Sequence, residues 1–373
     1  MALSAAEATL VPPVQGRAGD PWEAVVRLAL NLGYLSSWND PEAFLTVAQE
    51  AERLGFSCVW VAEAYGSDAP SLLSWIAGQT ERIELGSAVF QIPARTPAMT
   101  AMTAATIDKL SGGRFRLGLG VSGPQVSEGW HGVRFGKPLK RTREFVDIVN
   151  LALSRKVVQY DGEFYTLPLP DGPGKALKLI LHPVRDHVPV YLAAVGPKNL
   201  ELTGEIADGW LAIFFSPEYA SESLGSIAAG RAKVGKTLDG FEVAASVPVV
   251  FGDDVAMCAE LVRPYAALYV GGMGSREQNF YNALATRMGY GDAAKEIQDL
   301  YLAKKHRDAA AAVPLEFIDR TSLLGPVERV AERLKAYQEA GLTELSTIVF
   351  GDPEYSISTI RQLADAWEKA GLS

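Results

Sequence analysis

Apolar runs of strand length alternate with amphipathic segments along most of the chain, and short stretches rich in glycine, proline and capping residues separate them. A first apolar run at 26–33 precedes a segment with helical spacing at 41–54, which Asp40 begins as an N-cap and Gly55 ends. The same alternation recurs to the C-terminus. The predicted strands are 26–33, 57–62, 83–90, 115–119, 190–195, 210–214, 241–251 and 345–350, and the predicted helices are 41–54, 69–80, 97–110, 141–154, 197–207, 217–234, 253–270, 326–340 and 357–370.

Repeated strand–helix units imply parallel strands, and eight of them in this length predict an α/β fold, a closed (β/α)8 TIM barrel. An open doubly wound sheet would need a dinucleotide fingerprint after the first strand, which residues 31–34 do not supply. Two stretches break the alternation. Residues 155–188 carry a hairpin signal at 161–162, and residues 271–324 begin with a glycine-rich turn and continue with helical segments. We expect one barrel domain at 24–373 with these two insertions, after a flexible arm at 1–23.

Composition narrows the class of protein. Of 373 residues 48% are apolar and 21% charged, which is typical of a globular protein with a large core. The formal charge of −9 argues against a nucleic-acid or membrane partner. Cys58 and Cys258 lack neighbours at metal-binding spacing, and no stretch resembles a signal peptide or a membrane span. We therefore expect a cytoplasmic protein without a metal site.

The stretch 114–131 contains the first candidate site. A short apolar strand ends at Leu119, and Gly120 and Gly123 let the backbone turn beyond it. Ser122 and Gln125 place polar side chains just after the strand, where barrel enzymes bind their ligands. Taken alone, the pattern is equally typical of a turn that binds nothing.

A second candidate site lies where a predicted strand passes into a helix at 194–199. Gly196 leaves backbone N–H groups free, and Pro197 suits the first helical turn. Such a helix start favours a phosphate group, with Lys198 as a possible charge partner. A plain capped loop is the alternative.

Ten short segments between residues 61 and 274 occur together in an order that points to one family. The chain resembles the bacterial luciferase-like oxidoreductases, and within them the actinobacterial branch that uses the deazaflavin coenzyme F420. The matching segments are 61–68, 91–97, 110–114, 118–125, 128–130, 137–138, 141–144, 196–199, 207–210 and 271–274.

The resemblance implies a tricyclic cofactor over the carboxyl ends of the barrel strands. It places a bulge with a non-prolyl cis peptide at Ala88–Val89, under the centre of the ring. It also implies that the phosphate lies near 194–198 and that the chain forms a homodimer. The expected cofactor-binding residues are Glu63, Ala88, Val89, Gly120, Val121, Ser122, Gln125, Ala194, Val195, Gly196, Pro197 and Lys198.

Two residues are candidates for acid–base chemistry. Glu63 lies at the end of the second strand, where it could line the pocket and, against an apolar ring, donate a proton. A solvated loop carboxylate is the alternative. Some relatives place a histidine after this position, but here it is Ala64. His131 follows Trp130 near the site, although a lone histidine is more often structural.

A basic cluster stands out in this acidic chain and has two interpretations. A solvated surface is the favoured one. A clamp for the acidic oligoglutamyl tail of F420 is the other, and it would favour F420 over flavin mononucleotide. The cluster comprises Arg134, Lys137, Lys140, Arg141 and Arg143.

These features predict an F420-dependent oxidoreductase that transfers a hydride between the deazaflavin C5 and a small organic substrate. The stretch 271–312 is long enough to cover the pocket and to shape substrate choice. Two alternatives remain open: a monooxygenase that uses reduced flavin mononucleotide, and a barrel that binds a flavin-like ligand without turnover.

Overall fold

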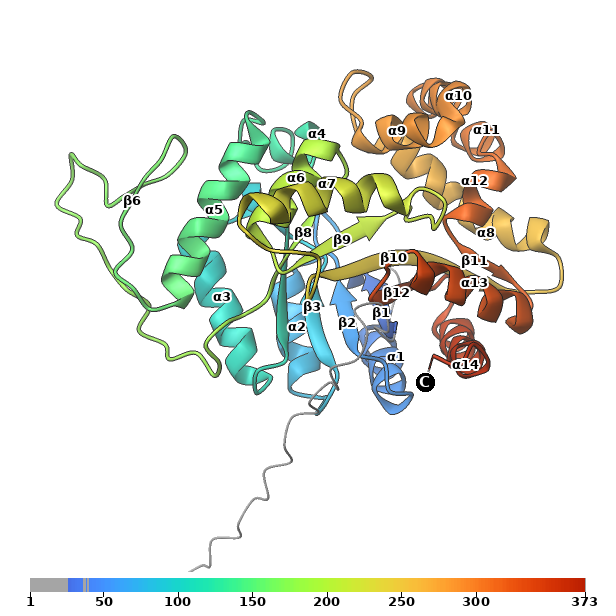
Figure 1. Cartoon of the computed structure of the whole chain (residues 1–373), viewed down its shortest axis with the longest axis horizontal. Coiled ribbons are helices and arrows are strands. Elements are labelled where there is room, and N and C mark those ends of the chain that lie inside the picture. The colour runs from blue at the N-terminus through green and yellow to red at the C-terminus, as the bar shows by residue number, and fades with distance from the viewer. Residues whose placement is uncertain (1–25, 36–37, 39, 373) are drawn as a thin grey trace, which may run out of the picture.

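The computed structural model describes residues 26–35, 38 and 40–372, and its strands form a closed parallel barrel (Figure 1). Neighbouring strands pair in the order β1, β2, β3, β5, β8, β9, β10 and β12, and the pairing of β12 with β1 closes the ring. The predicted TIM barrel is therefore confirmed, whereas the arm at 1–23 lies outside the described residues. The barrel strands are β1 Arg27–Gly33, β2 Cys58–Val61, β3 Glu84–Ser87, β5 Phe115–Gly120, β8 Val190–Ala193, β9 Gly209–Ile213, β10 Glu242–Phe251 and β12 Glu344–Ile348.

The helices that surround the barrel begin where the sequence supplies caps. Asp40 accepts a hydrogen bond of 3.0 Å from Glu42 N at the start of α1, and Thr96 accepts one of 3.1 Å from Met99 N at the start of α3. Gly55, at φ +82°, follows the end of α1. The outer helices are α1 Pro41–Arg53, α2 Ala69–Ala77, α3 Pro97–Leu110, α5 Pro138–Leu153, α6 Pro197–Ile206, α7 Ala220–Lys233, α8 Val255–Ala267, α13 Val327–Glu339 and α14 Pro353–Lys369.

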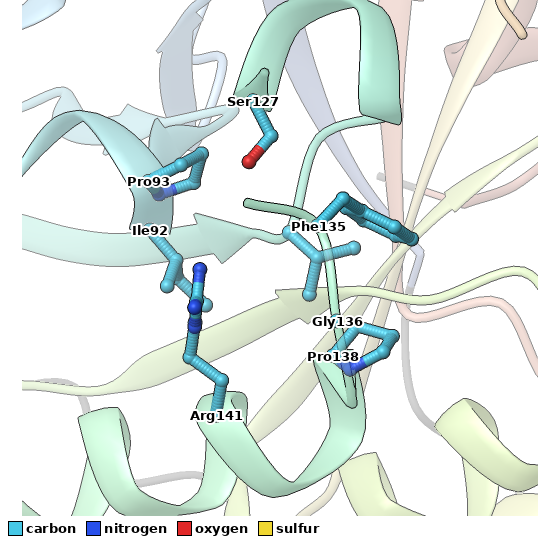
Figure 2. Close-up of a pocket in the computed structure, with 8 residues that line it drawn as sticks. Ile92, Pro93, Ser127, Phe135, Gly136, Pro138 and Arg141 are labelled. Atoms are coloured by element: carbon cyan, nitrogen blue, oxygen red, sulfur yellow. The ribbon is translucent and has the colours of Figure 1, made fainter. Parts of the chain in front are cut away.

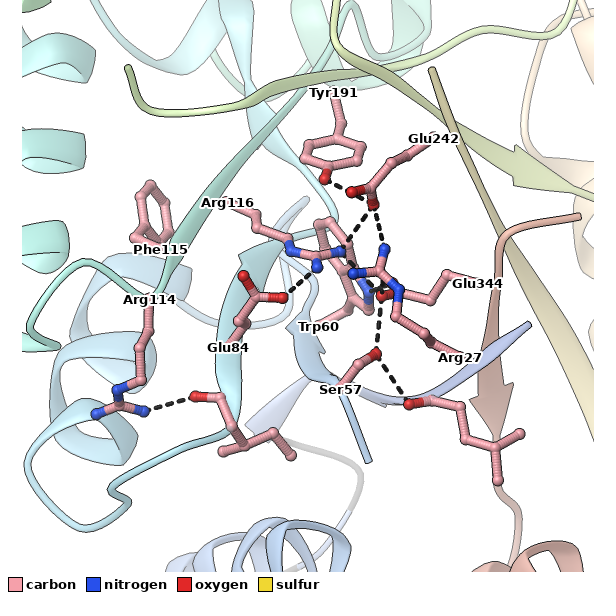
Figure 3. A network of polar contacts seen from close by, with 12 residues as sticks. Arg27, Ser57, Trp60, Glu84, Arg114, Phe115, Arg116, Tyr191, Glu242 and Glu344 are labelled. Atoms are coloured by element: carbon pink, nitrogen blue, oxygen red, sulfur yellow. Dashed lines mark hydrogen bonds and ion pairs between the residues drawn. The ribbon is translucent and has the colours of Figure 1, made fainter. Parts of the chain in front are cut away.

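Charged and aromatic side chains fill the barrel interior from its amino end (Figure 3). Arg116 lies 2.9 Å from Glu344 and 3.1 Å from Glu242, and both Arg116 and Glu344 are buried. Burial of these charges is tolerable because they are paired. Trp60 and Tyr191 pack edge to face deeper in the barrel, with ring centroids 5.4 Å apart. Because these side chains fill the interior of the barrel, a ligand-binding site is expected at the carboxyl end of the strands.

The first insertion forms the hairpin that the sequence predicted. Strands β6 Tyr160–Asp161 and β7 Thr166–Leu167 are antiparallel, and the chain then runs without helix or strand to β8. In Figure 1 this excursion extends from the side of the barrel, beside α5.

The second insertion is a helical unit with a hydrophobic core of its own. Phe214, Met288 and Phe317 are among the buried residues of this core, and Phe214 follows β9 directly. The insertion is thereby anchored to the carboxyl end of the barrel. It comprises the π-helical turns Leu268–Gly272 and Thr286–Tyr290 and the helices α9 Phe280–Ala285, α10 Gly291–Leu302, α11 His306–Ala311 and α12 Leu315–Arg320.

Three predicted elements need correction. The third strand is not continuous over 83–90: β3 ends at Ser87 and a separate β4 occupies Phe90–Gln91. A short strand, β11 Leu323–Gly325, was missed, and it pairs with the end of the long β10. Helix α14 begins at Pro353 rather than at 357, because Asp352 caps it by accepting from Tyr355 N at 2.8 Å.

Candidate functional site

The predicted cofactor residues all lie at the carboxyl end of the barrel. Glu63 follows β2, Ala88 and Val89 lie between β3 and β4, and Gly120 is the last residue of β5. Val121 and Ser122 follow β5, and Gln125 lies in the short helix α4 Pro124–Ser127. The segment 194–198 joins β8 to α6. The barrel closure thus brings loops from four strands around one opening, although they are distant in the sequence.

The segment between β3 and β4 packs directly against glycines of β5. The Ala88–Val89 peptide is cis, at the position that the resemblance implied. A Cβ on Gly118 would fall 1.8 Å from Ser87 O, and one on Gly120 would fall 2.5 Å from Val89 Cγ2. The absence of side chains at Gly118 and Gly120 therefore lets residues 87–89 pack closely against β5.

Glu63 is held by an ion pair instead of facing an apolar surface. Its carboxylate is buried, pairs with Arg95 and accepts a hydrogen bond of 3.2 Å from Gln91 N. Arg95 also contacts Asp68 at 3.1 Å. The carboxylate is therefore an acceptor that fixes β4, and its expected role as a proton donor against an apolar ring stays a prediction.

The side chain of Gln91 links two residues of the predicted site. Its Nε2 donates to Ser122 Oγ at 2.7 Å, and His131 Nε2 lies 3.1 Å from its Oε1. Because an amide oxygen only accepts, Nε2 of His131 carries the proton in this contact. Ser122 has a positive φ of +57°, which is unusual for a residue with a side chain and turns its hydroxyl toward Gln91.

Gln91 and Arg95 were missed as site residues by the sequence analysis. Both lie within the segment 91–97, which contributed to the family resemblance, but no local pattern in it marks the partners of these two side chains. Gln125, by contrast, is exposed, and its backbone oxygen accepts a hydrogen bond of 3.0 Å from Gly129 N in the next turn. The structure brings Glu63, Ser122 and His131 together through Gln91.

The start of α6 has the open geometry that a bound anion requires. Gly196 is its N-cap and makes no side-chain cap, and a Cβ there would meet nothing within 4 Å. Asn199 Oδ1 is buried without a hydrogen-bond partner in the described structure. Lys198 is exposed beside it, and Arg287 of the second insertion donates to Val195 O at 2.9 Å. Free backbone N–H groups at a helix start attract negative charge.

Three of the five residues of the basic cluster pair with carboxylates, and only two carboxylates serve them. Lys137 and Lys140 both pair with Glu163, and Arg143 pairs with Glu205. Arg141 instead stacks over the ring of Phe164 at 4.6 Å. Its side chain reaches into a small pocket near β4 and the loop after β5 (Figure 2). That pocket is lined by Ile92, Pro93, Val121, Ser127, Phe135, Gly136, Pro138 and Arg141.

The described part of the chain offers neither a metal-binding cluster nor a membrane-spanning helix. Among those residues, no cluster of three or more His, Cys, Asp or Glu side chains could hold a metal ion. No helix within 26–35, 38 and 40–372 combines the length and apolar character needed to cross a membrane.

A parallel barrel with glycine-lined loops and an open helix start at its carboxyl end is typical of barrel enzymes that bind a phosphate-bearing ligand. The sequence profile of the luciferase-like monooxygenase family matches residues 24–344, and the chain belongs to this family.

Relatives and a solved structure agree with this membership. A putative coenzyme F420-dependent oxidoreductase of Mycobacterium tuberculosis is 43% identical over 328 residues, covering 86% of this chain and 94% of the relative. The 5,10-methylenetetrahydromethanopterin reductase of Archaeoglobus fulgidus is 31% identical over 309 residues, covering 81% and 87%. The F420-dependent tetrahydromethanopterin reductase structure from Methanopyrus kandleri superposes with a TM-score of 0.77 at 23% identity, covering 90% of this chain and 97% of that one.

Proposed function

We propose that this chain is a coenzyme F420-dependent oxidoreductase that transfers a hydride between the deazaflavin C5 and a small organic substrate. The likeness to the mycobacterial F420-dependent relative over most of both chains carries this function. When bound, the deazaflavin supplies or accepts the hydride. The protein positions the two reactants, excludes water and holds the proton that completes the exchange.

The loops at the carboxyl end of the barrel fit a flat ring. Gly118 and Gly120 leave these two positions of β5 without side chains, so Val89 can pack against the strand and would support the ring from below. Val121 and Ser122 continue from the end of β5 at the same edge. We infer that Ala88, Val89, Gly120, Val121, Ser122 and Gln125 contact the ring and its side chain.

The open start of α6 fits the cofactor phosphate. The first backbone N–H groups of α6 have no intrahelical acceptor, and Gly196 makes no side-chain cap. We infer that segment 194–198 holds the phosphate and that Lys198 adds charge attraction. Because three of the five residues of the basic cluster are already paired, the case for a clamp on the oligoglutamyl tail is weaker.

Of the two candidate acid–base residues, His131 suits proton transfer better. Its Nε2 is fixed by Gln91, so its ring orientation is set and Nδ1 stays available to a reactant or to water. Glu63 is engaged with Arg95 and Gln91 N. We infer that Glu63 orients β4 and that His131 holds or moves the proton.

The description of the family as luciferase-like monooxygenases favours a second candidate, a monooxygenase that uses reduced flavin mononucleotide. Anaerobic oxidation of reduced F420 by a panel of enones, imines and ketones, followed by absorbance, tests the first function. Oxygen consumption with reduced flavin mononucleotide tests the second. Turnover in the first assay with background oxygen consumption in the second supports the proposal, and the reverse pattern overturns it.

We also propose that the chain is a cytoplasmic homodimer. Met99, Met102 and Leu110 are exposed on the outer surface of α3, which supports contact with a second copy. Cys58 and Cys258 are both free and buried, as is common in a reducing compartment. Light scattering of the purified protein and fractionation of cells that express it would test the two statements.

A further inference from the structure

The opening of the barrel has two unlike halves. Polar and glycine-lined loops follow β2, β3, β5 and β8, where the proposed cofactor residues lie. Aromatic residues occupy the other half: Tyr34 follows β1, Phe214 follows β9, and Phe350 lies just beyond β12. Helix α8 and the second insertion add Tyr265, Tyr269 and Tyr281 to this half.

The rings of Tyr265, Tyr269 and Tyr281 pack on one another, and Tyr34 lies on the neighbouring loop after β2. The ring of Tyr269 lies 4.8 Å from that of Tyr265 and 4.9 Å from that of Tyr281, and Phe214 backs Tyr265 at 5.7 Å. The ring of Tyr34 packs on the backbone of Gly66 in the loop after β2, because a Cβ on Gly66 would fall 2.4 Å from it. The four tyrosines, here named the tyrosine wall (Tyr34, Tyr265, Tyr269 and Tyr281), are each only half-buried.

The tyrosine wall carries hydrogen-bonding groups but no net charge. Burial, and then the neighbouring phenol of Tyr34, raises the pKa of Tyr281 to about 12. Burial and nearby phenols likewise raise the pKa of Tyr265. No Asp, Glu, Lys or Arg among the described residues contributes to either shift. These hydroxyls therefore stay protonated at every working pH and act as neutral donors.

The hydroxyls of Tyr265 and Tyr269 belong to half-buried rings that pack on each other, and each phenol carries one O–H. An O–H at this surface can donate a hydrogen bond to a molecule that lies on the wall.

We propose, resting on the function proposed above, that the tyrosine wall binds the substrate on the side opposite the deazaflavin, and that this substrate is an uncharged planar carbonyl or imine compound. Its flat body would pack on the rings, and its oxygen or nitrogen would accept a hydrogen bond from the Tyr265 or Tyr269 hydroxyl. A carboxylate or phosphate group on the substrate would lose its hydration at the tyrosine wall, and no cationic side chain of the wall would compensate for that loss.

Calorimetric titration of the F420-loaded protein with acetophenone and with 4-acetylbenzoate tests this proposal. The two ketones differ by one carboxylate. We expect acetophenone to bind at least tenfold more tightly. We expect the substitutions Tyr265→Phe and Tyr269→Phe, which keep the rings, to weaken acetophenone about three- to tenfold and to leave the F420 Kd unchanged.

Tyr160→Phe is the matched control. Tyr160 lies on the hairpin insertion, and the substitution removes a hydroxyl that donates to Asp147 at 3.0 Å. It should leave both Kd values unchanged. Equal or tighter binding of 4-acetylbenzoate, no binding of acetophenone, or acetophenone binding unaltered in the Tyr265→Phe/Tyr269→Phe double variant would overturn the proposal. Failure of the wild-type protein to bind F420 would instead overturn the proposed function, and the inference with it.

Discussion

His131 Nε2 lies 3.1 Å from Gln91 Oε1, and this contact joins the loop after β5 to the short strand β4. The same amide donates to Ser122 Oγ at 2.7 Å. A buried side chain therefore sets both the histidine ring and the serine hydroxyl at the edge of the proposed cofactor site.

Replacing Gln91 should disorder this edge without unfolding the protein. Gln91→Met keeps the length of the side chain and removes both hydrogen bonds, each worth about 0.5–1.5 kcal/mol. We expect kcat to fall about tenfold, with little change in the F420 Kd. Gln49→Met, on the outer face of α1, is the control, and a wild-type kcat for Gln91→Met would contradict the account.

Gly118 should not tolerate a methyl group. In Gly118→Ala the new Cβ would lie 1.8 Å from Ser87 O, so strands β3 and β5 would have to separate. We expect the free energy of unfolding to drop by about 3 kcal/mol. Gly225→Ala, in α7 with open space around its Cβ, should instead raise it by about 0.5–1 kcal/mol. Urea denaturation of both variants measures the difference, and equal stabilities would refute the close packing.

An ion pair between the first and last helices should make the fold sensitive to acid. The hydrogen bond from Arg53, with a further one from Arg361 of α14, lowers the pKa of Glu50 to about 2. Because the pKa of Glu50 in the folded protein lies below its usual value near 4.5, the ion pairs of Glu50 stabilise the fold fully above pH 4.5. This contribution is lost as the pH falls from 4.5 toward 2.

Glu50→Gln should therefore cost about 1 kcal/mol at pH 7, because the two arginines are largely exposed, and the loss should vanish near pH 2. Denaturation midpoints between pH 2 and pH 7 measure this. Glu332→Gln, at an exposed position of α13, serves as the reference. A Glu50→Gln variant that follows the wild-type pH dependence would contradict the assignment.

The barrel could be predicted from the sequence because residues within or next to each strand and helix mark where it lies. Asp40 and Gly55 mark the ends of α1 in the sequence, and the apolar runs mark the strands. The break at Ala88–Val89 was available from the family resemblance alone, since the apolar run passes through it unbroken.

Contacts between distant segments could not be predicted in the same way. Nothing near Glu63 in the sequence shows that Arg95 will pair with it, because the pairing depends on how β2 and β4 meet in the closed barrel. Tyr34 and Tyr269 come together for the same reason: one follows β1 and the other belongs to the second insertion. Short β11 carries too few residues to show a pattern.

Lys198 should contribute charge to cofactor binding. If the phosphate lies at the start of α6, Lys198→Ala should raise the F420 Kd about two- to fivefold at low ionic strength, and the difference should shrink in 0.5 M salt. Lys156→Ala, at the hairpin insertion, should have no effect. Titrations at two salt concentrations check this, and a salt-independent or absent effect would place the phosphate elsewhere.

The central claim is the use of F420, and parallel titrations of the purified protein with F420 and with flavin mononucleotide test it most directly. Trp130 is exposed at the opening of the barrel, 6.5 Å from the ring of Tyr65, so its fluorescence should report binding. We predict saturable quenching with F420 at low concentration, weak quenching with flavin mononucleotide, and loss of most of the signal in Trp130→Phe. Tight binding of flavin mononucleotide with negligible binding of F420 would contradict the account.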